Sequence, residues 1–425
     1  MLYYSSLNPS MHSVDTLIIG GGIAGASLAC SLAERGTGPQ TTLVDVDLFG
    51  RYSSSELNGG GVRCVFAEPL NIKLSLASIE YYRAHASNFD FRQRGYLWLY
   101  DSNLWQEART FLPLVRSSNI EVQELHSADL KHKYPFLGDL SDIAGATFSP
   151  GDGRLNPHRL RMHYLNQAEG GGVQFMDRWA ITKIENDSPP YRVTLRRIQP
   201  RTVRRTLENL TTTPAACGTS VPLFLSEQLQ LQARRIINAA GPWAATVASM
   251  YANNLPVRPL PRQVFLLNPA SIDFEPSPFF IDYVQDLYFR HYQYQRQSTL
   301  LVSWSDPNEQ SKIDFSRRGE SYYREHIHPR LTNRIPALTD SPIITTWSGH
   351  YEMSADKFAI IGPVPNRKEI YNYNGLSAHG VMQSRALGDS LAHYLTTGTW
   401  PADLNLDALS QSRFETPGTV EKMYV

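Results

Sequence analysis

The most apolar stretch of the chain lies near its start and changes its period halfway. Residues 16–19 form a short apolar run of the kind found in buried strands, whereas small and apolar residues recur at helical spacing after Gly25. Gly36 ends this second pattern, as glycine commonly does just past a helix. Another apolar run follows at residues 41–44. The pattern predicts a strand, a helix and a second strand in succession, which is a βαβ arrangement.

Three glycines stand between the first strand and the helix, in the spacing Gly20-x-Gly22-x-x-Gly25. The first permits a tight turn, the second lets a pyrophosphate approach the backbone, and the third allows close packing of helix on strand. The free N–H groups at the helix start then face the phosphates. Asp45 ends the second strand, about twenty residues beyond Gly25, where an acid can bind ribose hydroxyls. This order of signals predicts a dinucleotide site.

A polar loop rich in glycine follows at residues 53–63. Successive glycines allow the backbone to pack against a flat ligand, and serine and asparagine side chains can bond phosphates or ring edges. A domain that binds NAD would be expected to continue into its next strand and helix here, so the loop favours FAD. The alternative is an ordinary surface loop. The candidate cofactor ligands in this loop are Ser54, Ser55, Asn58, Gly60 and Gly61.

Composition and charge place few further limits on function. The chain has 425 residues, which suits two domains, and its 42% hydrophobic and 19% charged content is ordinary for a globular protein. Lys plus Arg and Asp plus Glu both number 40, so no net field attracts nucleic acid or anionic membranes. Three cysteines without a CxxC pair indicate neither a disulfide framework nor a zinc site. We read no secretory signal in residues 1–15 and expect a cytoplasmic protein.

Three further segments extend the pattern along the chain. Residues 152–157 read Asp-Gly-Arg-Leu-Asn-Pro, residues 236–243 place Ala-Ala-Gly-Pro-Trp after an apolar run, and residues 358–363 are followed by His-Gly within residues 374–380. Together with the two glycine loops, these segments resemble the D-amino-acid oxidase superfamily of FAD-dependent enzymes. Within it, the chain resembles the branch that contains sarcosine oxidase, glycine oxidase and dimethylglycine dehydrogenase.

The resemblance implies an α/β (α+β) fold, with a Rossmann-type FAD-binding domain and a second, mostly antiparallel β-sheet substrate domain. It implies a discontinuous FAD-binding domain of residues 1–90, 145–245 and 340–425, and a substrate domain of residues 91–144 and 246–339. The chain between residues 262 and 304 agrees with this division, because short β-like runs alternate there with polar turns.

The resemblance also implies further contacts to FAD. They are Ala240, Gly241 and Trp243 in the fourth segment and Gly362, Gly380, Val381 and Met382 in the last. Monomeric sarcosine oxidases attach the flavin to a cysteine where this chain has Gly349. Residues 53–63 also lack a histidine like the one that forms the link in dimethylglycine dehydrogenases. We therefore expect noncovalent FAD.

Four residues are candidates for the chemistry that the resemblance implies. Arg63 matches the position at which sarcosine-oxidase-like enzymes hold the substrate carboxylate, although it could instead be a structural arginine bonded to backbone carbonyls. Tyr351 matches a residue that lines the substrate pocket, and His379 one near the flavin ring. Arg290, in the predicted substrate sheet, is a second candidate for binding a carboxylate.

Three departures from the family pattern leave the substrate, the electron acceptor and possible partners open. Met382 stands where relatives carry a basic residue, and Arg385 could substitute for it. Residues 300–303 lack the lysine with which sarcosine oxidases promote reaction with oxygen, which favours a dehydrogenase that passes electrons to a quinone or carrier. Residues 196–232 are longer than the usual connection and rich in arginine. They are either a basic arm for a protein partner, an electron acceptor or a peripheral membrane, or a solvated loop.

The activity that the resemblance implies is oxidation of a C–N bond in a secondary amine or amino acid, similar to sarcosine, glycine or a D-amino acid, by hydride transfer to the flavin. Two alternatives stay open. Residues 404–414 resemble a subset that contains a mitochondrial respiratory-complex assembly factor, which would suit a noncatalytic FAD-binding partner protein. The same superfamily also supports oxidation of 2-hydroxy acids.

Overall fold

The computed structural model describes residues 13–48, 50–210, 224–269, 272–416 and 418–423. Cys217 and part of the arginine-rich segment, residues 211–223, lie outside the described residues, as does most of the segment read for a secretory signal. No helix in the described ranges is long and apolar enough to span a bilayer.

The predicted βαβ unit is present at the start of the described chain. Strand β1 (Ser13–Ile19), helix α1 (Ile23–Glu34) and strand β2 (Thr41–Asp45) follow one another, and β1 pairs parallel with β2. On its other side β1 pairs parallel with β11 (Phe224–Asn238), which in turn pairs parallel with β18 (Ile370–Asn374). Segments far apart in sequence thus place their carboxyl ends at one edge, where open α/β sheets bind ligands.

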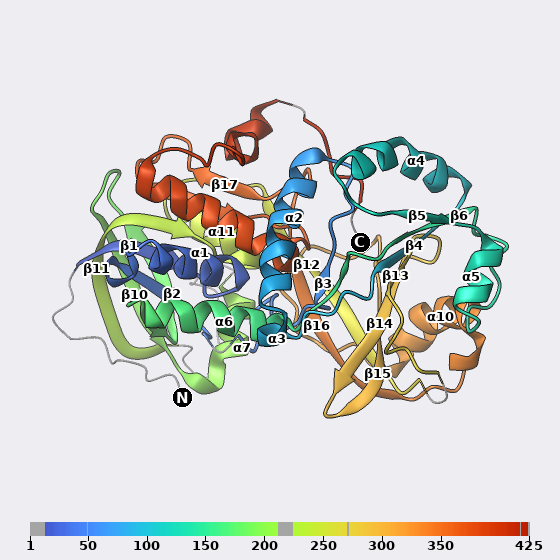
Figure 1. Cartoon of the computed structure of the whole chain (residues 1–425). Coiled ribbons are helices and arrows are strands. Elements are labelled where there is room, and N and C mark those ends of the chain that lie inside the picture. Colours follow the sequence, from blue (N-terminus) through green and yellow to red (C-terminus); the bar gives the residue numbers. More distant parts are fainter. Residues whose placement is uncertain (1–12, 49, 211–223, 270–271, 417, 424–425) are drawn as a thin grey trace.

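Among the described residues, this first sheet has eight strands and a cover of helices. Its central order is β17 (Ile360–Pro363), β18, β11, β1, β2 and β8 (Gln174–Asp177), with β10 (Tyr191–Ile198) and β9 (Trp179–Glu185) continuing antiparallel from β11. Helix α1 packs between α6 (Pro157–Gly170) and α11 (Gly380–Thr397), and α11 packs on α2 (Pro69–Ala84). Figure 1 shows these helices over one face of the sheet.

The second sheet confirms the prediction of a second, mostly antiparallel sheet. Every neighbouring pair of its described strands is antiparallel except β13 and β4. The β-like runs noted between residues 262 and 304 lie in β12, β14 and β15. The strand order is β16 (Ile343–Ser354), β12 (Val257–Leu267), β15 (Gln297–Trp304), β14 (Leu287–Tyr294), β13 (Phe279–Asp282), β4 (Tyr96–Tyr100), β6 (Gly145–Ser149) and β5 (Gln123–Leu125).

Shorter elements complete the described chain. The molecule has two lobes, the first built around the first sheet and the second around the second sheet (Figure 1). Strands β3 (Gly61–Val62) and β7 (Gly153–Arg154) pair with each other near the junction of these lobes. The remaining helices are α3 (Ala86–Phe89), α4 (Ser102–Ser117), α5 (Ser127–Lys133), α7 (Val203–Asn209), α8 (Ala244–Ser249), α9 (Glu320–Tyr322) and α10 (His328–Arg334). Helices α4, α5 and α10 lie beside the second sheet (Figure 1).

Side chains of the second sheet alternate between two cores, as a pleated strand requires. On β4, Tyr96, Trp98 and Tyr100 join the large core that also contains the helices of the first lobe. Leu97 and Leu99 point the other way, into a separate core with side chains of α5 and α10. One face of the sheet therefore looks toward the first lobe, and any cavity between the lobes is lined by that face.

The predicted division into FAD-binding and substrate segments stays a prediction, but sheet membership bears on its boundaries. Strands of the first sheet come from residues 13–45, 174–238 and 360–374. Strands β6 and β16 belong to the second sheet, although the prediction assigned residues 145–245 and 340–425, which contain these strands, to the FAD-binding domain.

Candidate active site

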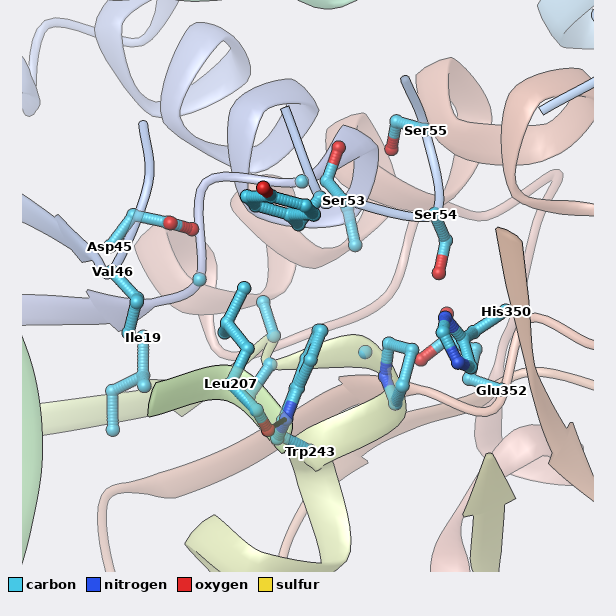
Figure 2. Close-up of a pocket in the computed structure, with 18 of the residues that line it drawn as sticks. Ile19, Asp45, Val46, Ser53, Ser54, Ser55, Leu207, Trp243, His350 and Glu352 are labelled. Carbon is cyan, nitrogen blue, oxygen red and sulfur yellow. Dashed lines mark hydrogen bonds between the residues drawn. The ribbon is translucent and has the colours of Figure 1, made fainter. Parts of the chain in front are cut away.

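An elongated pocket follows the carboxyl edge of the first sheet and ends against β16. Figure 2 shows Ile19 and Asp45 at one end, His350 and Glu352 with Ser54 beside them at the other, and Trp243 between the two ends. The lining includes the turn after β1, the loop after β2, the segment after β11 and the start of α11. The predicted cofactor residues that line it are Gly20, Gly22, Asp45, Ser54, Ser55, Asn58, Ala240, Gly241, Trp243, Gly380 and Val381.

The glycine turn has the geometry that the spacing predicts. Gly20 has a φ of +106°, a backbone conformation that L side chains rarely adopt. A Cβ at Gly25 would lie 1.9 Å from the Gly20 carbonyl oxygen, so α1 can approach the turn only because Gly25 has no side chain. A Cβ at Gly22 would meet only the Ser55 hydroxyl, at 3.7 Å. Gly25 therefore serves helix packing, whereas Gly22 leaves room on the pocket side.

Asp45 is held at the end of β2 by backbone donors. Its carboxylate accepts hydrogen bonds from the Gly21 N–H (2.5 Å) and the Asp47 N–H (2.6 Å). Burial raises the pKa of Asp45, and these two hydrogen bonds oppose the rise. The carboxylate is thus fixed at the pocket wall where the sequence predicts a ribose contact.

Arg161 was not predicted, and it ties the pocket wall together. This fully buried side chain of α6 donates to the carbonyls of Gly21 (2.9 Å) and Leu48 (2.8 Å) and to the Glu56 carboxylate (2.9 Å). Its Nη2 has no hydrogen-bond partner among the described residues. Arg161 lies nine residues after Asp152, and no local pattern distinguished it from the other arginines of the chain.

The loop after β2 contributes both bonded and unbonded polar groups. The Ser55 hydroxyl accepts the Ile23 N–H at 2.9 Å and so caps α1. Asn58 accepts the Gly60 N–H at 2.6 Å, and the Gly60 carbonyl accepts the Leu155 N–H. The Ser54 hydroxyl is buried and has no partner in the described structure, although it lines the pocket. Ser54 is therefore available to a ligand.

A smaller pocket adjoins the first and contains three of the four predicted catalytic residues. Arg63, Tyr351 and His379 line it together with Gly61 and Met382. Its other walls are aromatic and aliphatic side chains of the second sheet, namely Tyr96, Phe279, Ile281 and Tyr288. Asn58, Tyr351 and Ala378 line both pockets, so the two spaces meet there.

Arg63 makes the contacts of a structural arginine in this pocket. Its guanidinium donates to the backbone carbonyls of Val65 and Met423 and stacks 3.9 Å from the Phe66 ring centroid. Its Nη2 lies 3.4 Å from His379 Nε2. Burial, Arg63 and Lys357 hold the pKa of His379 well below its usual range, so this imidazole is neutral.

Arg290, Gly362 and Arg385 lie away from the pocket linings, as do Gly25 and Gly60 among the predicted cofactor ligands. Arg290 is buried behind the loop and donates to the carbonyls of Gly59 and His291, and burial lowers its pKa to about 10. Gly362, with a φ of +107°, lies in β17 beside Trp400. Arg385 does not replace the missing basic residue at Met382, because it pairs with Glu34 (2.7 Å) on the side of α1.

Helix α7 covers part of the pocket, which neither interpretation of the arginine-rich segment anticipated. Leu207 and Leu210 line the pocket, and the Leu207 carbonyl accepts the Trp243 indole N–H at 2.8 Å. Val203 and Leu207 are buried in a small apolar cluster with Phe315. The described part of the insertion is therefore not a solvated loop. The spacing of Val203, Thr206 and Leu207 carried the helical signal.

Glu352 is a buried acid with one oxygen turned to the pocket. Its Oε2 has no hydrogen-bond partner among the described residues, and it lies 3.6 Å from where a Cβ at Gly241 would be. Burial raises its pKa to about 8, against hydrogen bonds from the Leu376 and Gly375 backbone that lower it. The carboxyl is protonated at neutral pH and can donate a hydrogen bond.

These features together fit FAD. The glycine turn at the start of α1 lines the pocket and suits a pyrophosphate, Asp45 suits a ribose, and the Ser54 and Glu352 oxygens still require partners. The Cys64 thiol bonds the Asp152 carboxylate at 3.0 Å and does not line either pocket, so the described residues offer no cysteine for a covalent link. No group of metal-ligating side chains was found in the described ranges.

Comparisons with known proteins agree with this geometry. Residues 15–394 match the family model of the FAD dependent oxidoreductases named DAO. The chain is 26% identical over 440 residues to FAD-dependent oxidoreductase domain-containing protein 1 of Xenopus laevis, covering 94% of this chain and 82% of that one. It is 24% identical over 420 residues to mitochondrial dimethylglycine dehydrogenase of Rattus norvegicus, covering 92% and 44%. The fold matches L-proline dehydrogenase from P. horikoshii with a TM-score of 0.77 at 22% identity, covering 95% and 98%.

Two glycine substitutions separate packing from ligand binding. We expect Gly25→Ala to lower the free energy of unfolding of the flavin-free protein by about 2 kcal/mol or more, because its Cβ collides with the Gly20 carbonyl. Gly22→Ala has room in the fold, so it should leave that stability nearly unchanged and reduce flavin content instead. Denaturant unfolding and the flavin-to-protein absorbance ratio check both. Equal destabilisation by the two variants would contradict the assignment.

Helix α7 should contribute to cofactor affinity. We expect Leu207→Ala to weaken FAD binding about threefold to tenfold, because it removes apolar surface from the pocket wall. Arg204→Ala is the matched control, since Arg204 lies on the exposed side of α7 and pairs with Glu208. Fluorescence titration of flavin-free protein with FAD measures both. Unchanged affinity in the Leu207 variant would show that α7 does not contact the cofactor.

The buried Glu352 should make stability pH-dependent. Its folded pKa of about 8 lies above the ordinary value of 4.5, so the unfolded carboxyl ionises first and the free energy of unfolding falls as pH rises between those values. We expect Glu352→Gln to remove this decline and to be relatively more stable at pH 8.5 than at pH 5, by on the order of 3 kcal/mol. Denaturant unfolding of flavin-free protein at both pH values tests this. Parallel pH profiles would refute it.

Proposed function

The chain belongs to the DAO family of FAD-dependent oxidoreductases, and from this premise we propose that it oxidises the C–N bond of a secondary amine or an amino acid with noncovalently held FAD. The observation that carries the proposal is the junction of the two pockets at Asn58, Tyr351 and Ala378. A nucleotide pocket that opens into a smaller aromatic pocket can bring a substrate carbon next to the reactive part of the cofactor.

The cofactor supplies the two-electron acceptor when it is bound. The polypeptide then has to orient the substrate and limit the access of water. Tyr96, Phe279 and Tyr288 form apolar walls of the smaller pocket. A substrate amine in that space loses a hydride equivalent from carbon and a proton from nitrogen, which gives an imine, and water hydrolyses the imine to a carbonyl compound and an amine.

His379 is poorly placed to take the substrate proton through Nε2. The Arg63 guanidinium lies 3.4 Å from that nitrogen, and a guanidinium can only donate. Nε2 is therefore the acceptor, and the ring proton sits on Nδ1. The neutral imidazole and the buried guanidinium instead fix the polar wall of the smaller pocket. We propose that the amine proton leaves to solvent.

The electron acceptor is proposed to be a quinone or carrier. Residues 300–303, which lie in β15, contain no lysine that could promote reaction with oxygen. The cellular compartment and any partner of residues 196–232 stay predictions.

Anaerobic titration tests the proposed activity. We expect the absorbance of the bound flavin near 450 nm (roughly, for any oxidised flavin) to bleach with at least one compound among N-alkyl amino acids, proline, glycine and D-amino acids. Admitting air then separates oxidase from dehydrogenase. We expect slow reoxidation in air and fast reoxidation by a quinone.

The same titration decides between the alternatives. Bleaching by 2-hydroxy acids but not by amines would replace the proposal with hydroxy-acid oxidation. A flavoprotein that no amine, amino acid or hydroxy acid reduces would be a noncatalytic partner protein. The occupied Arg63 and the methionine at position 382 would then be the features that set it apart from its catalytic relatives.

A further inference from the structure

A third cavity, of about 960 Å³, lies on the lobe-facing side of the second sheet. It is bounded by α4, by the starts of β12 and β14, and by Met353 and Met423. Ile281 lines both this cavity and the smaller pocket beside Arg63. On β13 it lies between Phe279, in the smaller pocket, and Tyr283, in the cavity. The two spaces are therefore neighbours along one face of one sheet.

Arg262 is the unusual residue of this cavity. The side chain is only 8% exposed, yet its Nε and Nη1 have no hydrogen-bond partner among the described residues. Such groups require partners, since an unsatisfied buried donor is costly and a buried charge more so. The alternation of β12 places Arg262 on the same face as Val264 and Leu266, which belong to the core shared between the lobes. The guanidinium lines the cavity, where a ligand can reach it.

The position of Arg262 connects the cavity with the site of chemistry. Its Cζ lies 5.4 Å from the centroid of the Tyr351 ring. Tyr351 lines both the nucleotide pocket and the smaller pocket. A group bound to Arg262 would thus lie one side chain away from the junction of those pockets.

The charges around Arg262 favour an anion. Burial, Arg258 and Arg262 together lower the pKa of Lys357, which lines the same cavity, to about 8. Three acids of the cavity wall are already paired, Asp282 with Arg334 (2.6 Å), Glu309 with Arg318 (2.7 Å) and Glu107 with Lys422 (2.7 Å). A fourth, Asp306, accepts the Asn308 N–H at 2.9 Å. Asp286 also faces the cavity, where burial raises the pKa of its carboxyl, and the positive charges of Arg330 and Arg262 oppose part of that rise.

The rest of the lining suits an apolar group. Tyr100, Phe111, Leu255 and Leu260 all face the cavity. Glycine or sarcosine would leave such a space largely filled with water. A longer apolar substituent would bury against these walls and gain the free energy of that burial.

We propose that this cavity is the outer half of the substrate site, in which the Arg262 guanidinium binds the carboxylate of an amino acid or N-alkyl amino acid carrying a large apolar substituent. The inference rests on the proposed oxidation of an amine or amino acid and names its substrate class. Arg63 cannot fill this role without giving up contacts, because its guanidinium already donates to Val65 and Met423. Within the described ranges, Arg262 has no such contacts to lose at Nε and Nη1.

Binding of unreactive carboxylates to the flavin-loaded protein tests the inference without turnover. The probes are straight-chain carboxylates from acetate to hexanoate and the pair 3-phenylpropionate and 3-phenylpropanamide, with dissociation constants read from flavin difference spectra. We expect each added methylene to strengthen binding about threefold. The phenyl acid should bind about tenfold or more tightly than its amide, because an ionic hydrogen bond is lost in the amide. Equal binding of acid and amide, or affinity independent of chain length, would overturn the proposal.

Variants identify the residue responsible. Arg262→Gln should abolish the preference for the acid, and Arg262→Lys should retain part of it. Arg258→Gln is the matched control, because it removes the same charge from an exposed position of β12 at the wall of the same cavity. If Arg258→Gln weakens acid binding as much as Arg262→Gln, the carboxylate is not held by Arg262 in particular and the assignment is wrong. Comparison of acid and amide on the unmodified protein stands even if the Arg262→Gln variant does not fold.

The results separate this inference from the proposed function. If the carboxylate probes behave as expected but no amine or amino acid bleaches the flavin, the oxidation proposal fails while the anion site stands. If sarcosine and glycine reduce the flavin as efficiently as N-methylphenylalanine, oxidation is supported and the substrate class inferred here is wrong.

Discussion

The close approach of α1 to the turn after β1 determines where everything else in the site can lie. Gly25 allows it, because any side chain there would occupy the space of the Gly20 carbonyl. The turn is then held from outside by Arg161, which bonds Gly21 and Leu48, and from the pocket side by Ser55, which caps α1. Together these bonds join the turn and the start of α1 to helix α6 and to the loop after β2. These bonds hold the loop after β2 against the turn, and residues 58, 59 and 61 of that loop line the smaller pocket.

The sequence predicted those features that are encoded by residues close together in the chain. The βαβ unit, Asp45 and the loop at residues 53–63 are contiguous patterns, and the structure has the first two where they were predicted. Contacts between distant segments left no such pattern. Neither the Met423 carbonyl on Arg63 nor Arg161 beneath the turn could be read from neighbouring residues. Residues 203–207 of α7 did carry a helical spacing of apolar residues, but the many arginines around them favoured the interpretation of a basic arm or a solvated loop.

Arg63, in the smaller pocket, and Arg262, in the neighbouring cavity, show why residue type alone was a poor guide to role. Arg63 occupies the position that the family pattern favours, yet backbone carbonyls and an imidazole surround its guanidinium. Arg262 belongs to no motif, yet its side chain lines a cavity and two of its buried nitrogens have no hydrogen-bond partner among the described residues. Hydrogen-bond satisfaction, which only the structure reveals, distinguishes a cation that holds the fold from one that can hold a ligand.

The nucleotide half and the substrate half of the site are therefore specified in different ways. The first depends on backbone approach at glycines and on a few fixed acceptors, so short motifs describe it well. The substrate half is lined by side chains from several strands of one sheet. Every second residue of such a strand faces this side, and these residues can be substituted without disturbing the backbone pairing of the strands. Substrate preference can vary on this face while the cofactor half stays constant. For that reason the family assignment fixes the cofactor, whereas the substrate has to be argued from the cavity and from Arg262.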